Sequence, residues 1–281
     1  MRITRDQIRA YYDQNTRLFL AFHRSGKAEN IHRSLWTTNT KTLEEALNRI
    51  NEYVLNEIEA VAPMHARIAD LGCGVGASLM YISPRLKAPE TAVGITLSPV
   101  QARLAHQFTK ACGLGGQINF VEGDFTSVPL ASGTLDVVYS VEAVVHAQEP
   151  DRYFREAGRL LRVGGKLILV DDYRTARPLS FNESRWLNTF RNGWHVPGVV
   201  TVEQAQAFAA KHHLQFVKND NLTPYLRLRN LPSFVALALL FVGNALPIRH
   251  AILPAMLGSL ALQQCLSMNV IEYRFLVFER I

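Results

Sequence analysis

Residues 68–77 combine an acid with three glycines in a pattern that predicts ligand binding. They read IADLGCGVGA, so that Asp70 ends a short apolar run and Gly72, Gly74 and Gly76 follow. Glycine lets a backbone turn sharply and approach a ligand closely. The apolar periodic segment that follows predicts a helix, whose first N–H groups lack partners within the helix and point toward the same place. The pattern therefore predicts a strand, a tight loop and a helix start that together bind a nucleotide-like ligand.

The glycine spacing is compatible with two kinds of nucleotide ligand. Gly72, Gly74 and Ala77 satisfy the dinucleotide fingerprint, which also requires an acid at the end of the second strand. Here the second predicted strand ends in Thr96, Leu97 and Ser98, without a carboxylate. A carboxylate before the glycines also favours a ligand with a positively charged end over a pyrophosphate.

Three ordered motifs identify the ligand through a family resemblance. Residues 69–77, ADLGCGVGA, resemble the first motif of the class I S-adenosylmethionine (SAM) methyltransferases. The segment GDF at 123–125 and the segment LLRVGGKL at 160–167 resemble the family's later motifs. The resemblance covers residues 67–172 and implies SAM as the cofactor. It implies that the methionine end contacts Asp70, Gly72 and Gly74, and that Asp124 binds the adenine amino group. The implied cofactor-binding residues are Asp70, Gly72, Cys73, Gly74, Asp124, Phe125 and Glu142.

The ribose end of the cofactor site departs from the family pattern. Most members have an acid where this chain has Thr96. The side chains of Thr96, Ser98 and Gln101 are the candidates to replace it. Ser98 lies before Pro99 at the first position of a predicted helix, which also fits a helix N-cap. A ribose contact and a capping role both stay open for Ser98.

Two further segments resemble enzymes that methylate carbon. GITLSPVQ at 94–101 resembles tocopherol C-methyltransferases and their plant amine-methylating relatives, and SVEAVVHA at 140–147 resembles sterol C-24 methyltransferases. Geranyl diphosphate methyltransferases carry a comparable glutamate. This resemblance implies methylation of a prenyl or terpenoid double bond, with rearrangement or cyclisation of the cation left open.

The residue types at 142 and 146 suit that chemistry. Methyl transfer to a double bond leaves a carbocation, which a fixed carboxylate at Glu142 would stabilise. His146 lies one helical turn further on if the segment is helical, and is a candidate base. Alternatively, Glu142 binds a backbone N–H and His146 packs. An alternative function is O- or N-methylation of an aromatic secondary metabolite, with His146 or His195 as the base.

Aromatic and basic residues outside the core complete the candidate site. They lie before the glycine loop, in the turn-rich segment 192–197, and after the sixth predicted strand. The candidate substrate-binding residues are Tyr11, His32, Trp36, Trp194, Tyr225 and Arg227. The sequence contains no acidic motif typical of a magnesium–diphosphate clamp, and we predict no metal site.

The elements that must position these residues alternate between strands and helices. Such alternation predicts an α/β fold with a parallel sheet and helices on both faces. Strands are expected at 68–71, 92–96, 118–122, 135–140, 166–170, 214–219 and 272–279. Helices are expected at 4–22, 42–60, 77–86, 99–112, 150–161 and 202–213. The resemblance implies a Rossmann-like sheet of seven strands, with the last two antiparallel.

The chain is expected to divide into an N-terminal helical arm and lid, 1–62, and a SAM-binding domain, 63–281, with a helical insertion at about 222–268. Residues 234–246 read FVALALLFVGNAL, which is shorter than the ~20 apolar residues of a membrane span. Buried helices and a lid over a lipophilic acceptor, in peripheral contact with a membrane, are both compatible with it.

Composition limits the remaining function classes. Of 281 residues, 48% are apolar, which excludes a largely disordered chain. The net charge of +6 is spread along the sequence, so nucleic-acid binding is not expected. Cys73, Cys112 and Cys265 are scattered, which predicts neither disulfides nor a zinc site and favours a cytoplasmic protein. Self-association as a homo-oligomer stays open.

Overall fold

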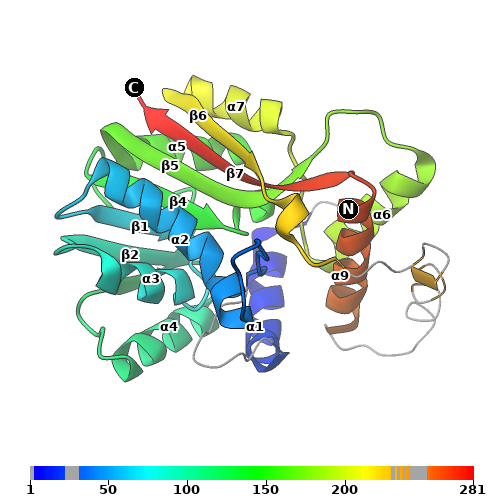
Figure 1. The fold of residues 1–281 in the computed structure, drawn as a ribbon, viewed down its shortest axis with the longest axis horizontal. Helices are drawn as coiled ribbons and strands as arrows, with labels where there is room; N and C mark the ends of the chain where they lie inside the picture. Colours follow the sequence, from blue (N-terminus) through cyan, green and yellow to red (C-terminus); the bar gives the residue numbers. More distant parts are fainter. Residues whose placement is uncertain are drawn as a thin grey trace.

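The computed structural model describes residues 3–22, 32–228, 232, 235, 236, 238, 240 and 252–281. Within them, one mixed sheet has the strand order β3-β2-β1-β4-β5-β7-β6 (Figure 1). Its strands are β1 (Arg67–Leu71), β2 (Thr91–Thr96), β3 (Asn119–Glu122), β4 (Leu135–Val141), β5 (Leu161–Arg174), β6 (Leu214–Asn221) and β7 (Ile271–Arg280). The first five are parallel, and β7 runs antiparallel between β5 and β6. The predicted seven-stranded Rossmann-like fold is confirmed.

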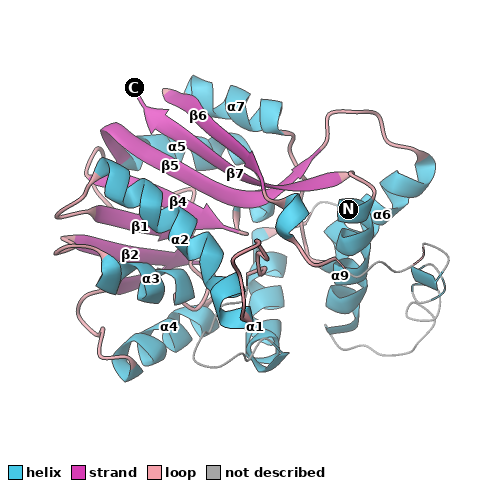
Figure 2. Ribbon diagram, in the orientation of Figure 1, coloured by secondary structure: helices cyan, strands magenta, loops and turns pink. Residues whose placement is uncertain are grey.

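Helices cover both faces of this sheet (Figure 2). They are α1 (Arg5–Phe22), α2 (Leu43–Val61), α3 (Ala77–Ile82), α4 (Pro99–Ala111), α5 (Pro150–Leu160), α6 (Phe181–Gly193), α7 (Val202–Lys211) and α9 (Ile252–Ser267). Short 3-10 turns lie at Ser83–Arg85, Val144–His146 and Thr223–Tyr225. Apolar residues of α2 and α3 pack on one face, and those of α5 and α7 on the other. Strands buried on both faces explain the nearly continuous apolar runs of the sequence.

Local capping signals set where several helices begin. The side chain of Thr42 accepts a hydrogen bond from the N–H of Glu45 at the start of α2, as predicted. Ser180 and Glu183 form a complete capping box at the start of α6. Helix α6 is not among the helices expected from the sequence, although this Ser-x-x-Glu pattern indicates its start.

Strand β5 is longer than the expected 166–170. It begins at Leu161, continues through Gly164 and Gly165, and pairs with β7 from Lys166 opposite Glu279 to Arg174 opposite Ile271. The β5–β7 pair extends past the other strands toward α6 and α9 (Figure 1). This extension carries two acids, Asp171 and Asp172, to the edge of the sheet where ligands bind in α/β folds.

The C-terminal insertion is described in part. Helix α9 packs closely against α6, because a Cβ on Gly193 would lie 2.4 Å from the carbonyl oxygen of Pro254. Most of the apolar run 234–246 lies outside the described residues, so the choice between buried helices and a lid over the acceptor stays open for it. In the part of the chain that the structure describes, no helix is both long and apolar enough to cross a membrane. The division at residue 62 stays a prediction.

Candidate functional site

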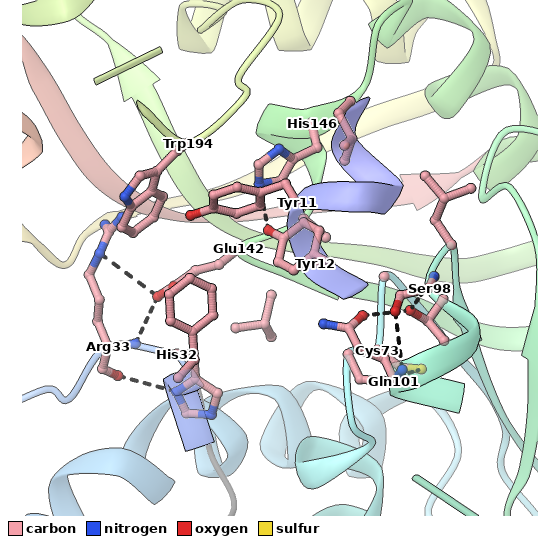
Figure 3. A pocket seen from close by; sticks show the side chains of 18 of the residues that line it. Tyr11, Tyr12, His32, Arg33, Cys73, Ser98, Gln101, Glu142, His146 and Trp194 are labelled. Carbon is pink, nitrogen blue, oxygen red and sulfur yellow. Dashed lines mark hydrogen bonds and ion pairs between the residues drawn. The ribbon is translucent and has the colours of Figure 1, made fainter. Parts of the chain in front are cut away.

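A cavity of about 810 Å³ opens at the carboxyl ends of β1, β2 and β4. Its wall combines the glycine loop with α1, with the segment 32–34 before α2, and with α9. The cavity has two parts, because the loop residues lie on one side and the aromatic residues on the other (Figure 3). The parallel strands explain the convergence, since their carboxyl ends all meet at one edge of the sheet.

The glycine loop has the geometry that the sequence predicts. The N–H groups of Gly72 and Cys73 both donate to the carbonyl oxygen of Ile95 on β2. Gly72 and Gly74 have φ angles of 97° and 56°, which side chains rarely adopt. A Cβ on Gly72 would lie 2.3 Å from that of Ala143, whereas a Cβ on Gly74 would meet no protein atom nearer than 4.0 Å. Gly74 lines the cavity, so a side chain there would occupy ligand space.

Asp70 fits the positively charged end of SAM. Its side chain is 2% exposed, and its Oδ1 has no hydrogen-bond partner among the described residues. Burial raises the pKa of Asp70 to about 8. The ammonium group of the cofactor's methionine end would satisfy Oδ1 and favour the charged carboxylate.

We expect SAM binding at pH 7 to release about one proton, because Asp70 changes from protonated to ionised on meeting the ammonium group. Calorimetry in buffers of different ionisation enthalpy measures this number. The Asp70→Asn variant should release none and should bind SAM more weakly. A wild-type binding enthalpy that is independent of the buffer would contradict the pairing.

The side chains at the end of β2 are connected to one another and to α1. Thr96 Oγ1 donates to Gln101 Oε1 at 2.7 Å, and Gln101 Nε2 donates to Thr16 Oγ1 at 3.2 Å. Ser98 caps α4 by accepting from the N–H of Gln101, and its hydroxyl donates to Asp13 of α1. The capping role of Ser98 is confirmed. The ribose role of Thr96, Ser98 and Gln101 stays a prediction, and the three residues do lie together at the cavity wall.

The adenine end centres on Asp124, which follows β3. Its Oδ1 accepts from the N–H and the hydroxyl of Thr126, and its Oδ2 pairs with Arg5 of α1 at 2.8 Å. Burial alone would raise the pKa of Asp124, but the hydrogen bonds from Thr126 and Arg5 lower it below its ordinary value. Phe125 also lines the cavity and packs edge-on against Tyr153. Both residues lie in the cavity wall, and their contact with the cofactor's base stays a prediction.

Helix α1 thus contacts three cofactor-site residues, through Arg5, Asp13 and Thr16. We expect SAM or S-adenosylhomocysteine to slow amide hydrogen exchange in α1 at least about tenfold, because bound cofactor holds the helix against the site. Hydrogen–deuterium exchange with mass spectrometry measures this, with α7 as the internal control. Slower exchange in residues 70–77 without any change in α1 would show that α1 closes independently of the cofactor.

A network of charged side chains surrounds Glu142 (Figure 3). Its Oε1 accepts from the backbone N–H of Arg33 at 2.9 Å and from the hydroxyl of Tyr273 at 2.7 Å. The guanidinium of Arg33 makes two hydrogen bonds of 2.6 Å to Asp172 and lies 4.5 Å from the centre of the Tyr273 ring. Although burial lowers the pKa of a guanidinium, Asp172 and Glu142 raise that of Arg33 overall. The network fixes the carboxylate of Glu142 in the cavity wall.

Glu142 is not part of a helix. It has a φ angle of 52°, and only Val144–His146 form a single 3-10 turn after it. The helical turn considered from the sequence is therefore wrong, yet both Glu142 and His146 line the cavity. The neighbouring Asp171 is almost fully buried, and burial raises its pKa to about 8. Its carboxyl group accepts from the N–H groups of Val145 and Asp172.

His146 is held between two elements. Its Nε2 lies 2.7 Å from the hydroxyl of Tyr12 on α1, and its Nδ1 lies 3.4 Å from the carbonyl oxygen of His195. Burial lowers the pKa of His146 to about 4, so the ring is neutral at physiological pH. The ring of His195 lies against Tyr11, 5.1 Å between centroids, and His195 itself is not part of the cavity wall.

Some of the remaining sequence-predicted residues line the cavity, and others lie behind its wall. Tyr11, His32, Trp194 and Arg227 line the cavity. Trp36 and Tyr225 do not line it. The ring of Trp36 stacks under the guanidinium of Arg227 at 3.3 Å, and the backbone N–H of Trp36 donates to the carbonyl oxygen of Tyr225. Trp194 donates to the carbonyl oxygen of Ala255 on α9. Among the described residues, no three His, Cys, Asp or Glu side chains are grouped to hold a metal ion.

Tyr12, like Tyr11, is a pocket candidate from the sequence, and the structure places its hydroxyl beside His146. Four further residues that build the site are not among the sequence candidates: Arg33, Asp171, Asp172 and Tyr273. The acidic pair was the available signal, since two consecutive acids in an otherwise apolar strand require partners. Nothing local to Arg33 or Tyr273 indicates their role.

Comparisons with known proteins agree with this geometry. Residues 69–169 match the family model described as a methyltransferase domain. Cycloartenol-C-24-methyltransferase 1 of Oryza sativa subsp. japonica is 29% identical over 160 residues, covering 57% of this chain and 44% of that protein. The 27-O-demethylrifamycin SV methyltransferase of Amycolatopsis mediterranei (strain S699) is 28% identical over 219 residues, covering 76% of each. The chain spans about half the length of several curated relatives that it matches.

A solved structure of geranyl diphosphate methyltransferase in complex with GPP and sinefungin superposes with a TM-score of 0.74 at 15% identity, covering 99% of both chains. This likeness is one of fold. The domain match, by contrast, is one of sequence and includes the glycine loop, Asp124 and Glu142. Because sheet order, loop geometry and domain match all agree, the chain contains a methyltransferase domain with the fold of the class I SAM-dependent methyltransferases, and its cofactor is S-adenosyl-L-methionine.

Proposed function

We propose that this protein methylates a carbon atom of a lipophilic small molecule, at a prenyl or terpenoid double bond. When bound, SAM supplies an electrophilic methyl group beside the glycine loop. The acceptor would occupy the part of the cavity formed by α1, the segment 32–34, Trp194 and α9. The apolar side chains that line the cavity favour a lipophilic acceptor: Ile8, Phe19, Leu43, Leu47, Leu226, Leu228, Met256, Leu262 and Leu266.

The observation that carries the proposal is the fixed carboxylate of Glu142. Within its network, two carboxylates, Glu142 and Asp172, face one cation, Arg33, so this network has one more negative than positive group. A preorganised negative charge stabilises a cation that forms during the reaction, and would disfavour a phenolate acceptor. The aromatic rings of Tyr11 and Trp194 in the same wall would add cation–π attraction.

The relatives support this choice of acceptor. The Oryza sativa protein is named for methylation at carbon C-24, and the superposed structure is named for geranyl diphosphate. Arg227, at the cavity wall, is a candidate for binding an anionic group of such an acceptor. A cytoplasmic location, a peripheral membrane contact and self-association stay predictions from the sequence.

The second candidate function is O- or N-methylation of an aromatic secondary metabolite. One specific observation favours it: His146 is a neutral imidazole in the cavity wall, and a neutral imidazole can take the proton of a hydroxyl or amine. The name of the Amycolatopsis mediterranei relative specifies an oxygen acceptor.

An acceptor panel tests the proposal. The protein is incubated with methyl-labelled SAM and geranyl diphosphate, farnesyl diphosphate, a phenol or an aromatic amine, and products are analysed by mass spectrometry. We expect a new carbon–methyl bond on a prenyl acceptor. Methylation restricted to the phenol or the amine would favour the second candidate instead.

A further inference from the structure

Tyr12 brings a hydroxyl group into the cavity wall next to His146 (Figure 3). The second ring nitrogen of His146, Nδ1, faces the carbonyl oxygen of His195, which can only accept a hydrogen bond. Nδ1 therefore carries the proton of the neutral ring. It follows that Nε2 has a free electron pair and accepts the hydrogen bond that Tyr12 donates.

The surroundings of this pair keep both side chains neutral, which a pair that accepts a proton requires. Burial lowers the pKa of His146 to about 4 and raises that of Tyr12, so both are neutral at physiological pH. The titratable groups that face the pair are Tyr11 on α1, Glu142 after β4, Asp171 on β5 and His195 after α6. The carboxylate of Glu142 among them would stabilise an imidazolium if His146 gained a proton.

Glu142 is less suited to take a proton than to stabilise charge. Its Oε1 already accepts two hydrogen bonds and lies 3.9 Å from Arg33 Nε. The roles of stabilising a cation and accepting its proton are therefore separated in this cavity.

We propose that Tyr12 takes the proton that the methylated acceptor must lose, and that His146 takes Tyr12's own proton at Nε2. This role rests on the proposed function. In the cationic acceptor, a C–H bond next to the charged carbon breaks, and its electron pair forms the new double bond. The proton passes to the oxygen of Tyr12 while the Tyr12 proton passes to Nε2. One positive charge leaves the acceptor and one imidazolium forms, so the charge of the cavity is unchanged.

The pairing gives α1 a catalytic task in addition to closing the cofactor site. Tyr12 is the catalytic residue, because it would touch the acceptor, and His146 positions it and stores the proton. The relay is complete only when α1 lies against the 3-10 turn Val144–His146. Water in the cavity would compete for the cation if α1 were displaced.

The experiment compares Tyr12→Phe and His146→Gln with wild type, using geranyl diphosphate as probe or another panel member that is methylated. Tyr53→Phe is the matched control, since it removes a tyrosine hydroxyl from α2 outside the cavity. We expect the rate at which the methylated alkene forms to fall about 100-fold in both test variants, which is the scale of a lost general base. The rate of S-adenosylhomocysteine formation should fall much less than the rate of alkene formation. A methylated alcohol should replace the alkene, because water captures the cation.

The outcomes separate this proposal from the proposed function. An alkene fraction unchanged in both test variants would overturn the relay and leave carbon methylation intact. If the true acceptor is a phenol, Tyr12→Phe should instead lower the rate of S-adenosylhomocysteine formation. That result would support Tyr12 as the proton acceptor but would overturn carbon methylation.

A second measurement needs no acceptor. ¹⁵N NMR of histidine-labelled protein should show His146 neutral at pH 7 with its proton on Nδ1, and Tyr12→Phe should shift the Nε2 resonance. A proton on Nε2 would overturn the relay whatever the acceptor proves to be.

Discussion

Replacing Glu142 with glutamine is expected to lower kcat about 100-fold on the true acceptor, the scale on which a preorganised electrostatic contact acts. Glutamine keeps the shape of the side chain, and its carbonyl oxygen can still accept from Arg33 N–H and the Tyr273 hydroxyl. What it removes is the negative charge near the forming cation. Steady-state kinetics and calorimetry measure the effect, with SAM affinity expected to change little.

Three further variants interpret that result. Tyr273→Phe removes one hydrogen bond to Glu142 but keeps the charge, so its effect should be much smaller than that of Glu142→Gln. His146→Ala and His195→Ala test the other function, in which a histidine matters more than a carboxylate. Near wild-type turnover of Glu142→Gln together with inactive histidine variants would favour O- or N-methylation.

The second large effect concerns the cofactor. Gly74→Val is expected to weaken SAM binding more than about 100-fold, that is by more than ~2.8 kcal/mol. The φ angle of Gly74 is 56°, and its absent Cβ points into open cavity rather than toward protein. A branched side chain would therefore take the space of the ligand. Calorimetric titration with SAM measures the loss, and circular dichroism establishes that the variant is folded.

A matched variant separates ligand exclusion from backbone strain. Gly113 has a φ angle of 73°, has no atom within 4 Å of its absent Cβ, and does not line the cavity. Gly113→Val imposes a similar strain after α4, where no cofactor binds. Its SAM affinity should equal that of wild type. Equal losses in both variants would mean that strain, rather than the position of the cofactor, explains the result.

The cofactor half of the site was predictable because its information is local. Strand, acid and glycines lie within ten residues, and each has a direct physical reason to be there. The same holds for Ser98, whose type and position before Pro99 indicate a cap that the structure contains. Lengths were less predictable. Strand β5 extends past the expected residue 170 because β7 pairs along it as far as Arg174, and that partner strand lies about a hundred residues away in the sequence.

The acceptor half was less predictable because its contacts are long-range. Arg33 meets Asp172 across 139 residues, and Tyr12 meets His146 across 134. Periodicity assigns such residues to elements but cannot pair them. The left-handed backbone at Glu142 illustrates the same limit: a helical spacing to His146 suggested one geometry, whereas hydrogen bonding of Glu142 N–H to Val170 on β5 imposed another.

The projecting β5–β7 pair has a consequence for how this enzyme could diversify. Asp172 and Tyr273 occupy directly opposed positions on the two strands, so backbone pairing sets their separation. Helices α6 and α9 are joined to the far end of the pair (Figure 1). Helix α9 and Trp194, which follows α6, contribute cavity wall. Helices at that end could be exchanged or reshaped without moving Asp172 and Tyr273. The architecture is thus modular, and substrate scope could be altered by grafting α6 and α9 as a unit onto an unchanged reactive centre.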